Sequence, residues 1–134
     1  MPTIKVQGSD FELTRDLVLS LPPGEDSENL LNLCVYNTVL SQEKHACGQY
    51  TGLHWKLLVN ELVENWSCQV KIRFLKNHNI LVRVESFDEG GYWGSTYTNV
   101  TEGEHVGVAL CKAALLFWLT LEEKEVLPFP KRGF

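Results

Sequence analysis

Residues Val106–Leu119 read VGVALCKAALLFWL, and the rest of the chain must cover this apolar stretch. Lys112 is its only charged residue, and its Ala and Leu residues favour a helix, so the stretch predicts a helix that is buried over most of its circumference. The apolar run is shorter than the roughly 20 residues that a membrane-spanning helix needs. We therefore expect the central helix of a folded core and no membrane partner.

The start of this helix is predicted from capping chemistry. Thr101 and Glu104 have the spacing of a capping box, in which two side chains satisfy free amide groups of the first turn, and Gly103 lies between them. The sequence therefore predicts a helix from Thr101 to Leu121, and we expect residues 122–134, with Pro128 and Pro130, to form an extended strap.

Length and composition indicate one folded domain over residues 1–134. The chain is long enough to bury a core without disulfides or metals, and it has no long low-complexity block. Its 12 basic and 17 acidic residues give a net charge of −5, which disfavours a duplex nucleic-acid partner, since such a surface is basic.

The four cysteines predict free thiols. Cys34, Cys47, Cys68 and Cys111 contain no Cys-x-x-Cys pair, and no signal peptide precedes them, so we expect reduced thiols in a cytoplasmic protein. Cys34 and Cys111 lie in apolar helical runs, where a free cysteine behaves as a small hydrophobic residue.

The N-terminal half predicts helices. Residues 1–10 form a tail or an edge strand, and Thr14–Leu21 predicts a short helix that begins at a Thr14 cap and ends before Pro22 and Pro23. A second helix is predicted over Glu28–Leu40, capped by Asp26 or Ser27. A third is predicted from Thr51 or Gly52 to Trp66, with Trp55, Leu58, Val59, Leu62 and Trp66 on one side and Lys56, Asn60, Glu61 and Glu64 mostly on the other.

A β-hairpin follows the third helix. In the first strand, apolar and cationic residues alternate, the apolar ones being Val70, Ile72 and Phe74. In the second, apolar residues alternate mostly with polar ones, and the apolar ones are Ile80, Val82 and Val84. Between the two strands, residues 76–79 are typical of a turn. One face of the hairpin is therefore apolar and the other polar, except for Leu81. Residues 86–99 (SFDEGGYWGSTYTN) form either a loop or a third strand over Trp93–Thr98.

The fold class that these elements predict is α+β, with helix layers packed on a small antiparallel sheet and a buried C-terminal helix. Two or three strands are few for a stable sheet. Either the N-terminal residues join the sheet or chains associate through an open edge, and we expect a homo-oligomer.

Three segments carry short motifs: Asp16–Val39, Tyr50–Leu62 and Val108–Leu119. The residues that make up these motifs are, in chain order, Leu19, Leu21, Pro22 and Gly24, then Tyr50, Thr51 and Trp55, and finally Ala109, Leu110, Cys111, Ala113, Ala114 and Leu115. With them the chain resembles the phage ABA sandwich domain, a family of small phage and prophage proteins. The resemblance implies helix layers on a sheet and a phage or prophage origin, with no catalytic residue. Residues 45–49 and 86–99 depart from the family pattern.

Signals for catalysis and metal binding are weak. His45 and Cys47 are close in sequence, and Cys111 could approach His54 or His105, but no Gly-x-Cys or Gly-x-Ser-x-Gly motif frames a nucleophile. The His45, Cys47, His54 and Cys68 spacings match no zinc pattern. We expect no enzyme activity, metal or cofactor; a small Cys/His hydrolase that depends on Cys47 or His54 is one alternative.

The strongest functional signal is an anion site. Residues 90–96 are rich in Gly, Ser and Thr but lack the Gly-Lys-Ser/Thr of a nucleotide-hydrolysing loop. Their amides and hydroxyls could hold an anion, an aromatic residue could stack on a base, and cations lie on neighbouring strands. The candidate residues are Lys71, Arg73, Arg83, Trp93, Ser95, Thr96 and Tyr97. A solvated sheet face beside a turn with a buried Trp explains the same pattern.

From these observations we expect a non-enzymatic phage accessory protein in the cytoplasm of its bacterial host. It would counter host defence by sequestering an anionic, nucleotide-like ligand. An acidic inhibitor that binds a host protein directly is the alternative.

Overall fold

The computed structural model describes residues 3–6, 10–40, 48–86 and 98–124. Its four helices are α1 (Arg15–Ser20), α2 (Glu25–Thr38), α3 (Trp55–Asn65) and α4 (Val106–Glu123). A two-stranded antiparallel sheet contains β1 (Ile4–Lys5) and β2 (Glu12–Leu13), and a three-stranded one contains β3 (Cys68–Phe74), β4 (Ile80–Ser86) and β5 (Thr98–Gly103). The predicted α+β class is confirmed.

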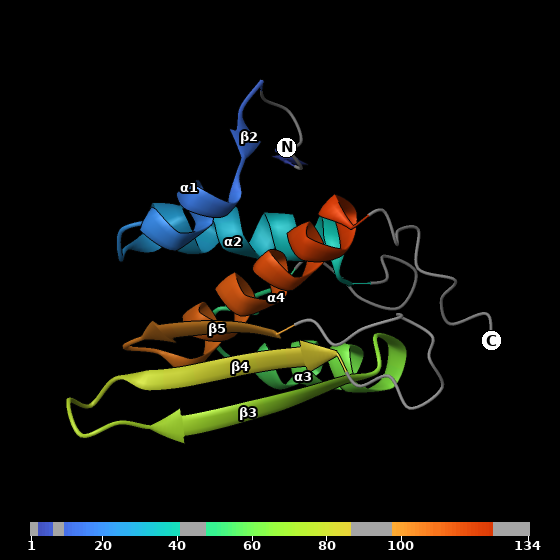
Figure 1. Cartoon of the computed structure of the whole chain (residues 1–134). Coiled ribbons are helices and arrows are strands. Elements are labelled where there is room, and N and C mark those ends of the chain that lie inside the picture. Colours follow the sequence, from blue (N-terminus) through green and yellow to red (C-terminus); the bar gives the residue numbers. More distant parts are fainter. Residues whose placement is uncertain (1–2, 7–9, 41–47, 87–97, 125–134) are drawn as a thin grey trace.

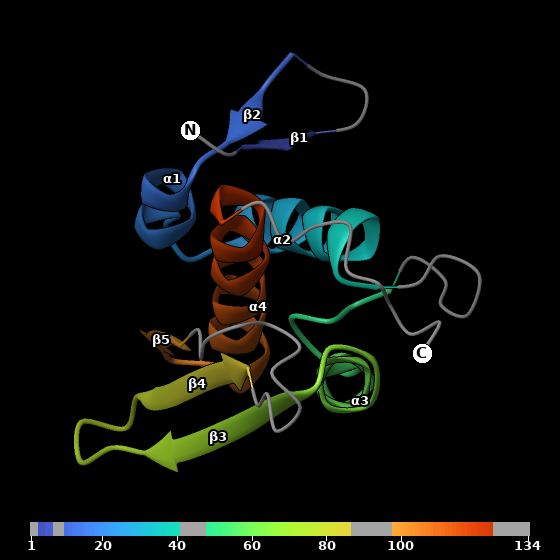
Figure 2. The ribbon, with the colours of Figure 1, turned by 45° about the vertical axis from the view of Figure 1, so that its right-hand side comes forward.

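Helix α4 lies at the centre of the molecule, between a helical layer and the three-stranded sheet (Figures 1 and 2). Helices α1 and α2 pack on one side of it, β4 and β5 pack on the other, and α3 contacts both α4 and β3. Residues on all sides of α4 are therefore buried, including Leu110, Leu115 and Phe117. The predicted buried C-terminal helix is confirmed.

The predicted start of α4 is wrong. Thr101 lies in β5, opposite Val82 of β4, and α4 begins at Val106 without a side-chain cap. The Thr101 hydroxyl donates to the carbonyl oxygen of Ala109, so it fastens the strand to the helix that follows. The backbone amide and carbonyl groups around Thr101 therefore bond to strand β4 and not within a helical turn. The third strand of the sheet runs from Thr98 to Gly103 and shares only Thr98 with the strand predicted over Trp93–Thr98, whose residues 93–97 lie outside the described part.

Helix α1 confirms its predicted cap, since the Thr14 hydroxyl accepts from the amide of Leu17 at 3.2 Å. Helix α2 begins at Glu25, earlier than predicted, and its N-cap is Gly24 rather than Asp26 or Ser27. Gly24 has φ +139°, a conformation that favours glycine. Strand β1 does not join the three-stranded sheet, because it pairs only with β2 (Figure 2).

A turn at residues 49–54 precedes α3, so the helix begins at Trp55 and not at Thr51 or Gly52. Asn32 of α2 holds this turn from both sides: its Oδ1 accepts from the Thr51 amide at 2.9 Å, and its Nδ2 donates to the Thr51 hydroxyl at 3.0 Å. The apolar side of α3 packs inward as predicted. Glu61, expected on the polar side, is buried and accepts from Asn65 at 2.9 Å.

The hairpin has the predicted alternation. Val70 pairs with Val84 and Ile72 with Val82, so these residues share the face that packs on the helices. The turn closes with a 2.9 Å hydrogen bond from the Leu75 amide to the Asn79 carbonyl, and His78 within it has φ +69°.

Polar side chains fasten the layers to one another. Arg15 of α1 donates to Asn99 of β5 at 3.3 Å and also to the Thr120 hydroxyl of α4. Lys112 of α4 donates to the Leu21 carbonyl at the end of α1, at 3.1 Å, and burial lowers the pKa of its amine. Both cations therefore bind oxygens that carry no formal charge.

The C-terminal end of α4 corrects the predicted strap. The helix continues through Glu123, so residues 122 and 123 are helical, and residues 125–134 lie outside the described part. Within the described ranges, no helix combines the length and apolar character that crossing a membrane requires.

We expect Gly107→Ala to destabilise the fold by roughly 1–3 kcal/mol, because a Cβ at this position would lie 2.3 Å from the Thr51 carbonyl oxygen and backbone atoms cannot move aside cheaply. Urea unfolding measures the change. The matched control is Gly103→Ala, whose Cβ would meet its nearest neighbour, the Ala109 Cβ, at an ordinary 3.7 Å. Equal losses in the two variants would contradict this account.

Candidate functional site

The predicted cations lie together on the outer face of the sheet, the face that points away from α4. The pairing register places Lys71 directly opposite Arg83, and Arg73 opposite Leu81. Side chains opposite each other on one face lie about 5 Å apart at Cβ, and residues two apart along a strand lie roughly 7 Å apart. Lys71, Arg73 and Arg83 are exposed, and we call them the cation cluster.

Acidic neighbours neutralise this cluster weakly. Arg83 approaches Glu85 at 3.9 Å, but the Arg83 side chain is 46% exposed, so solvent screens the pair. The Glu102 carboxylate accepts from the side-chain amides of Asn79 at 2.7 Å and Asn77 at 3.5 Å. Among the described residues, Lys71 and Arg73 have no ion pair. Two like charges therefore face each other across the strands, which is unfavourable for the sheet.

Two apolar residues on the open sheet were not predicted. Val100 of β5 lies in the same cross-strand row as Lys71 and Arg83 and is 41% exposed. The capping-box interpretation of residues 101–104 concealed this strand. Phe74 was assigned to the packed face, yet it is 77% exposed, because its position at the end of the hairpin carries it past the helices. The candidate surface is therefore cationic with Val100 beside the Lys71–Arg83 pair, whereas Phe74 belongs to the other face of the sheet and adds exposed apolar surface at the end of the hairpin.

The aromatic and hydroxyl part of the predicted site, formed by Trp93, Ser95, Thr96 and Tyr97, lies outside the described residues. The strand ends that flank it are described: β4 ends at Ser86 and β5 begins at Thr98, which pairs with Glu85. Arg83 is three residues before Ser86, and Arg73 lies further along the hairpin. Lys71 and Arg83 are thus the cluster members nearer to the loop ends.

The buried thiols are poor nucleophiles. Cys34, Cys68 and Cys111 are free and buried, and burial raises the pKa of each, that of Cys34 to about 11. His54 lies at the surface, where its Nδ1 accepts from the Gln49 amide at 3.1 Å. Within the described ranges, no three His, Cys, Asp or Glu side chains are grouped as a metal would require. His45 and Cys47 lie outside those ranges.

We expect the three buried thiols to resist labelling. A Cys47→Ser variant should react negligibly with dithionitrobenzoate at pH 8 while folded, because the thiolate is the reactive form and burial both disfavours it and blocks access. It should release three equivalents of thionitrobenzoate in denaturant. Rapid reaction of the folded variant would contradict the burial of Cys34, Cys68 and Cys111.

We also expect Lys71→Glu to stabilise the fold by about 0.2–1 kcal/mol, because it replaces a like-charge cross-strand pair with an attractive one opposite Arg83. Chemical unfolding measures the change. Lys76→Glu is the control, since Lys76 lies in the exposed turn and faces no strand partner. A loss of stability at position 71, or the same gain at both positions, would refute the repulsion.

Comparison with known proteins identified no match to a family model, a curated protein or a solved structure.

Proposed function

We propose that the chain is a binding protein whose outer sheet face takes an anionic, nucleotide-like ligand. One observation carries the proposal: Lys71 lies directly opposite Arg83, with Arg73 two residues along the same strand, on an exposed face of a chain with net charge −5. Repulsion among the three cations destabilises the free protein, and a bound anion would offset this repulsion.

The spacing of the cluster suits a ligand with at least two phosphates. Lys71 and Arg83 can close on one phosphate from neighbouring strands, and Arg73, roughly 7 Å along β3, can reach a second. The planar arginine guanidinium donates two parallel hydrogen bonds to phosphate oxygens. In this proposal Trp93 or Tyr97 stacks on the base, and Ser95 and Thr96 donate to the ligand.

A binding role without catalysis fits the same residues, because cations and hydroxyls are groups that hold an anion by charge and hydrogen bonds. Together with the resemblance to the phage ABA sandwich domain, this leads us to propose a phage accessory protein. It would act in the cytoplasm of its host, as a homo-oligomer, by sequestering a nucleotide signal of host defence.

We expect Lys71→Ala and Arg83→Ala each to weaken binding by roughly tenfold or more, since a hydrogen bond to a charged group contributes about 1.5–3 kcal/mol. The probe is ADP carrying a fluorescent label on the ribose, followed by anisotropy at two salt concentrations. Affinity should fall with salt. Lys76→Ala is the control, because that lysine lies in the hairpin turn, outside the cluster.

Binding that survives all three alanine substitutions in the cluster, with unchanged salt dependence, would overturn the proposed site. No binding of labelled ADP, with salt-sensitive capture of one basic host protein, would favour the acidic inhibitor instead. Native mass spectrometry of protein purified from its host separates these outcomes, because a sequestered nucleotide is released as a defined small mass on denaturation.

A further inference from the structure

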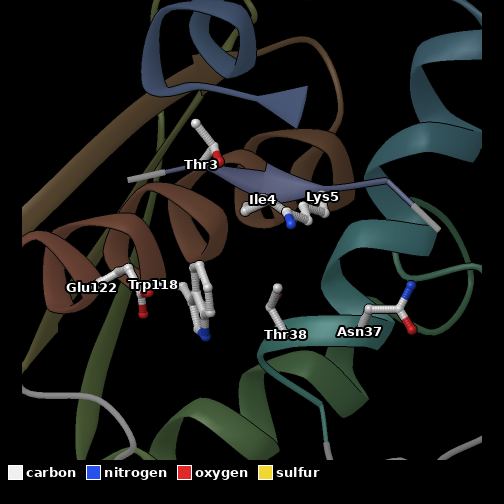
Figure 3. A pocket seen from close by; sticks show the side chains of 7 residues that line it. All are labelled: Thr3, Ile4, Lys5, Asn37, Thr38, Trp118 and Glu122. Atoms are coloured by element: carbon white, nitrogen blue, oxygen red, sulfur yellow. The ribbon is translucent and has the colours of Figure 1, made fainter. Parts of the chain in front are cut away.

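A second concave site lies on the other side of the molecule from the cation cluster. It is a cavity of about 480 Å³ between β1, the C-terminal end of α2 and the last turns of α4 (Figure 3). That volume is within the range of small-molecule sites, roughly 300–1,000 Å³. Three elements from distant parts of the sequence therefore line one open pocket with room for a small ligand.

The walls of this cavity combine apolar side chains with polar ones. The indole of Trp118 projects from α4 into the space between α4 and α2 (Figure 3), and it is only partly buried. Ile4 lines the cavity from β1, and the Thr38 hydroxyl is engaged within its own helix, where it donates to the Cys34 carbonyl at 2.7 Å. A partly accessible indole that lines a pocket is suited to stack on a planar ring.

Two opposite charges lie on the rim. Lys5 of β1 and Glu122 of α4 both line the cavity and both are exposed. They come from different elements, and Figure 3 shows the Trp118 side chain between Glu122 and the middle of the pocket. Within the described residues, neither Lys5 nor Glu122 forms an ion pair. A ligand with a negative group at one end and a positive group at the other would satisfy both.

We propose that this cavity binds a small aromatic zwitterion, of which a free aromatic amino acid is the simplest. The ring lies on Trp118, the carboxylate pairs with the Lys5 ammonium, and the ammonium pairs with the Glu122 carboxylate. Each contact is a complementary one: ring on ring, and each charge on its opposite. This site is independent of the cation cluster, which lies on the outer face of β3 and β4.

The experiment follows the indole Nε1–H signals in two-dimensional NMR spectra of ¹⁵N-labelled full-length protein. Trp118→Phe identifies the Trp118 signal by its disappearance, and the other indole signals report that the variant is folded. The probes are L-phenylalanine, phenethylamine, which lacks the carboxylate, and 3-phenylpropionate, which lacks the ammonium. We expect L-phenylalanine to shift the Trp118 signal saturably and each one-charge probe to bind at least tenfold more weakly.

Two charge variants test the assignment of each end. Lys5→Gln should weaken the binding of L-phenylalanine strongly and leave that of phenethylamine unchanged, because phenethylamine has no carboxylate to pair with Lys5. Glu122→Gln should weaken the binding of L-phenylalanine strongly and leave that of 3-phenylpropionate unchanged, because 3-phenylpropionate has no ammonium to pair with Glu122. Lys76→Gln, which removes the charge of an exposed lysine in the hairpin turn, is the control and should bind all three probes as the parent does.

The proposal is overturned if the Trp118 signal does not move at about 10 mM L-phenylalanine, a concentration that would detect even millimolar affinity. It is equally overturned if the shift is linear without saturation, or if Lys5→Gln and Glu122→Gln bind L-phenylalanine like the parent. A result of this kind leaves the proposed nucleotide site untouched, since the two sites share no residue.

Discussion

The structure depends on burial of α4 from both sides. Neither covering layer is stable by itself: α1 and α2, with 6 and 14 residues, are too short to persist as isolated helices in water, and the three-stranded sheet needs a helix on its apolar face. Each leucine that α4 buries contributes roughly 1.5–3 kcal/mol, which makes this helix the main source of stability for every other element. Gly107 permits the close contact of its first turn with the backbone at Thr51.

Directional contacts then fix how the layers sit on α4. The indole of Trp66 donates to the Val39 carbonyl at 2.9 Å and its ring meets Phe117 edge-on at 6.2 Å, which joins the ends of α2 and α3 to α4. Arg15 and Lys112 add bonds from α1 to β5 and α4. Because hydrophobic burial has no direction, these few hydrogen bonds select one arrangement among several that would bury the same area.

Local patterns in the sequence were sufficient for some elements and not for others. The period-two alternation of Val70 to Val84 predicted the hairpin and its cation face, since side chains alternate along a strand. The opposition of Lys71 and Arg83 also required the register, which the turn at residues 75–79 sets. Strand β5 was missed because its stability comes from pairing with β4, whereas its residue Thr101 and the following Glu104 imitate a helix cap. The Trp118 cavity joins three distant segments, so no local pattern could have revealed it.

The position of α4 in the chain has a consequence for synthesis on the ribosome. Its residues 106–123 are translated after every other described element, although all of those elements pack directly or indirectly against it. Until this helix leaves the exit tunnel, the nascent chain holds an amphipathic helical pair and an open sheet with no shared core, and their apolar faces remain exposed to water. The shared core therefore forms only once residues 106–123 have emerged, and before that point the chain is a natural client for chaperones that shield apolar surface.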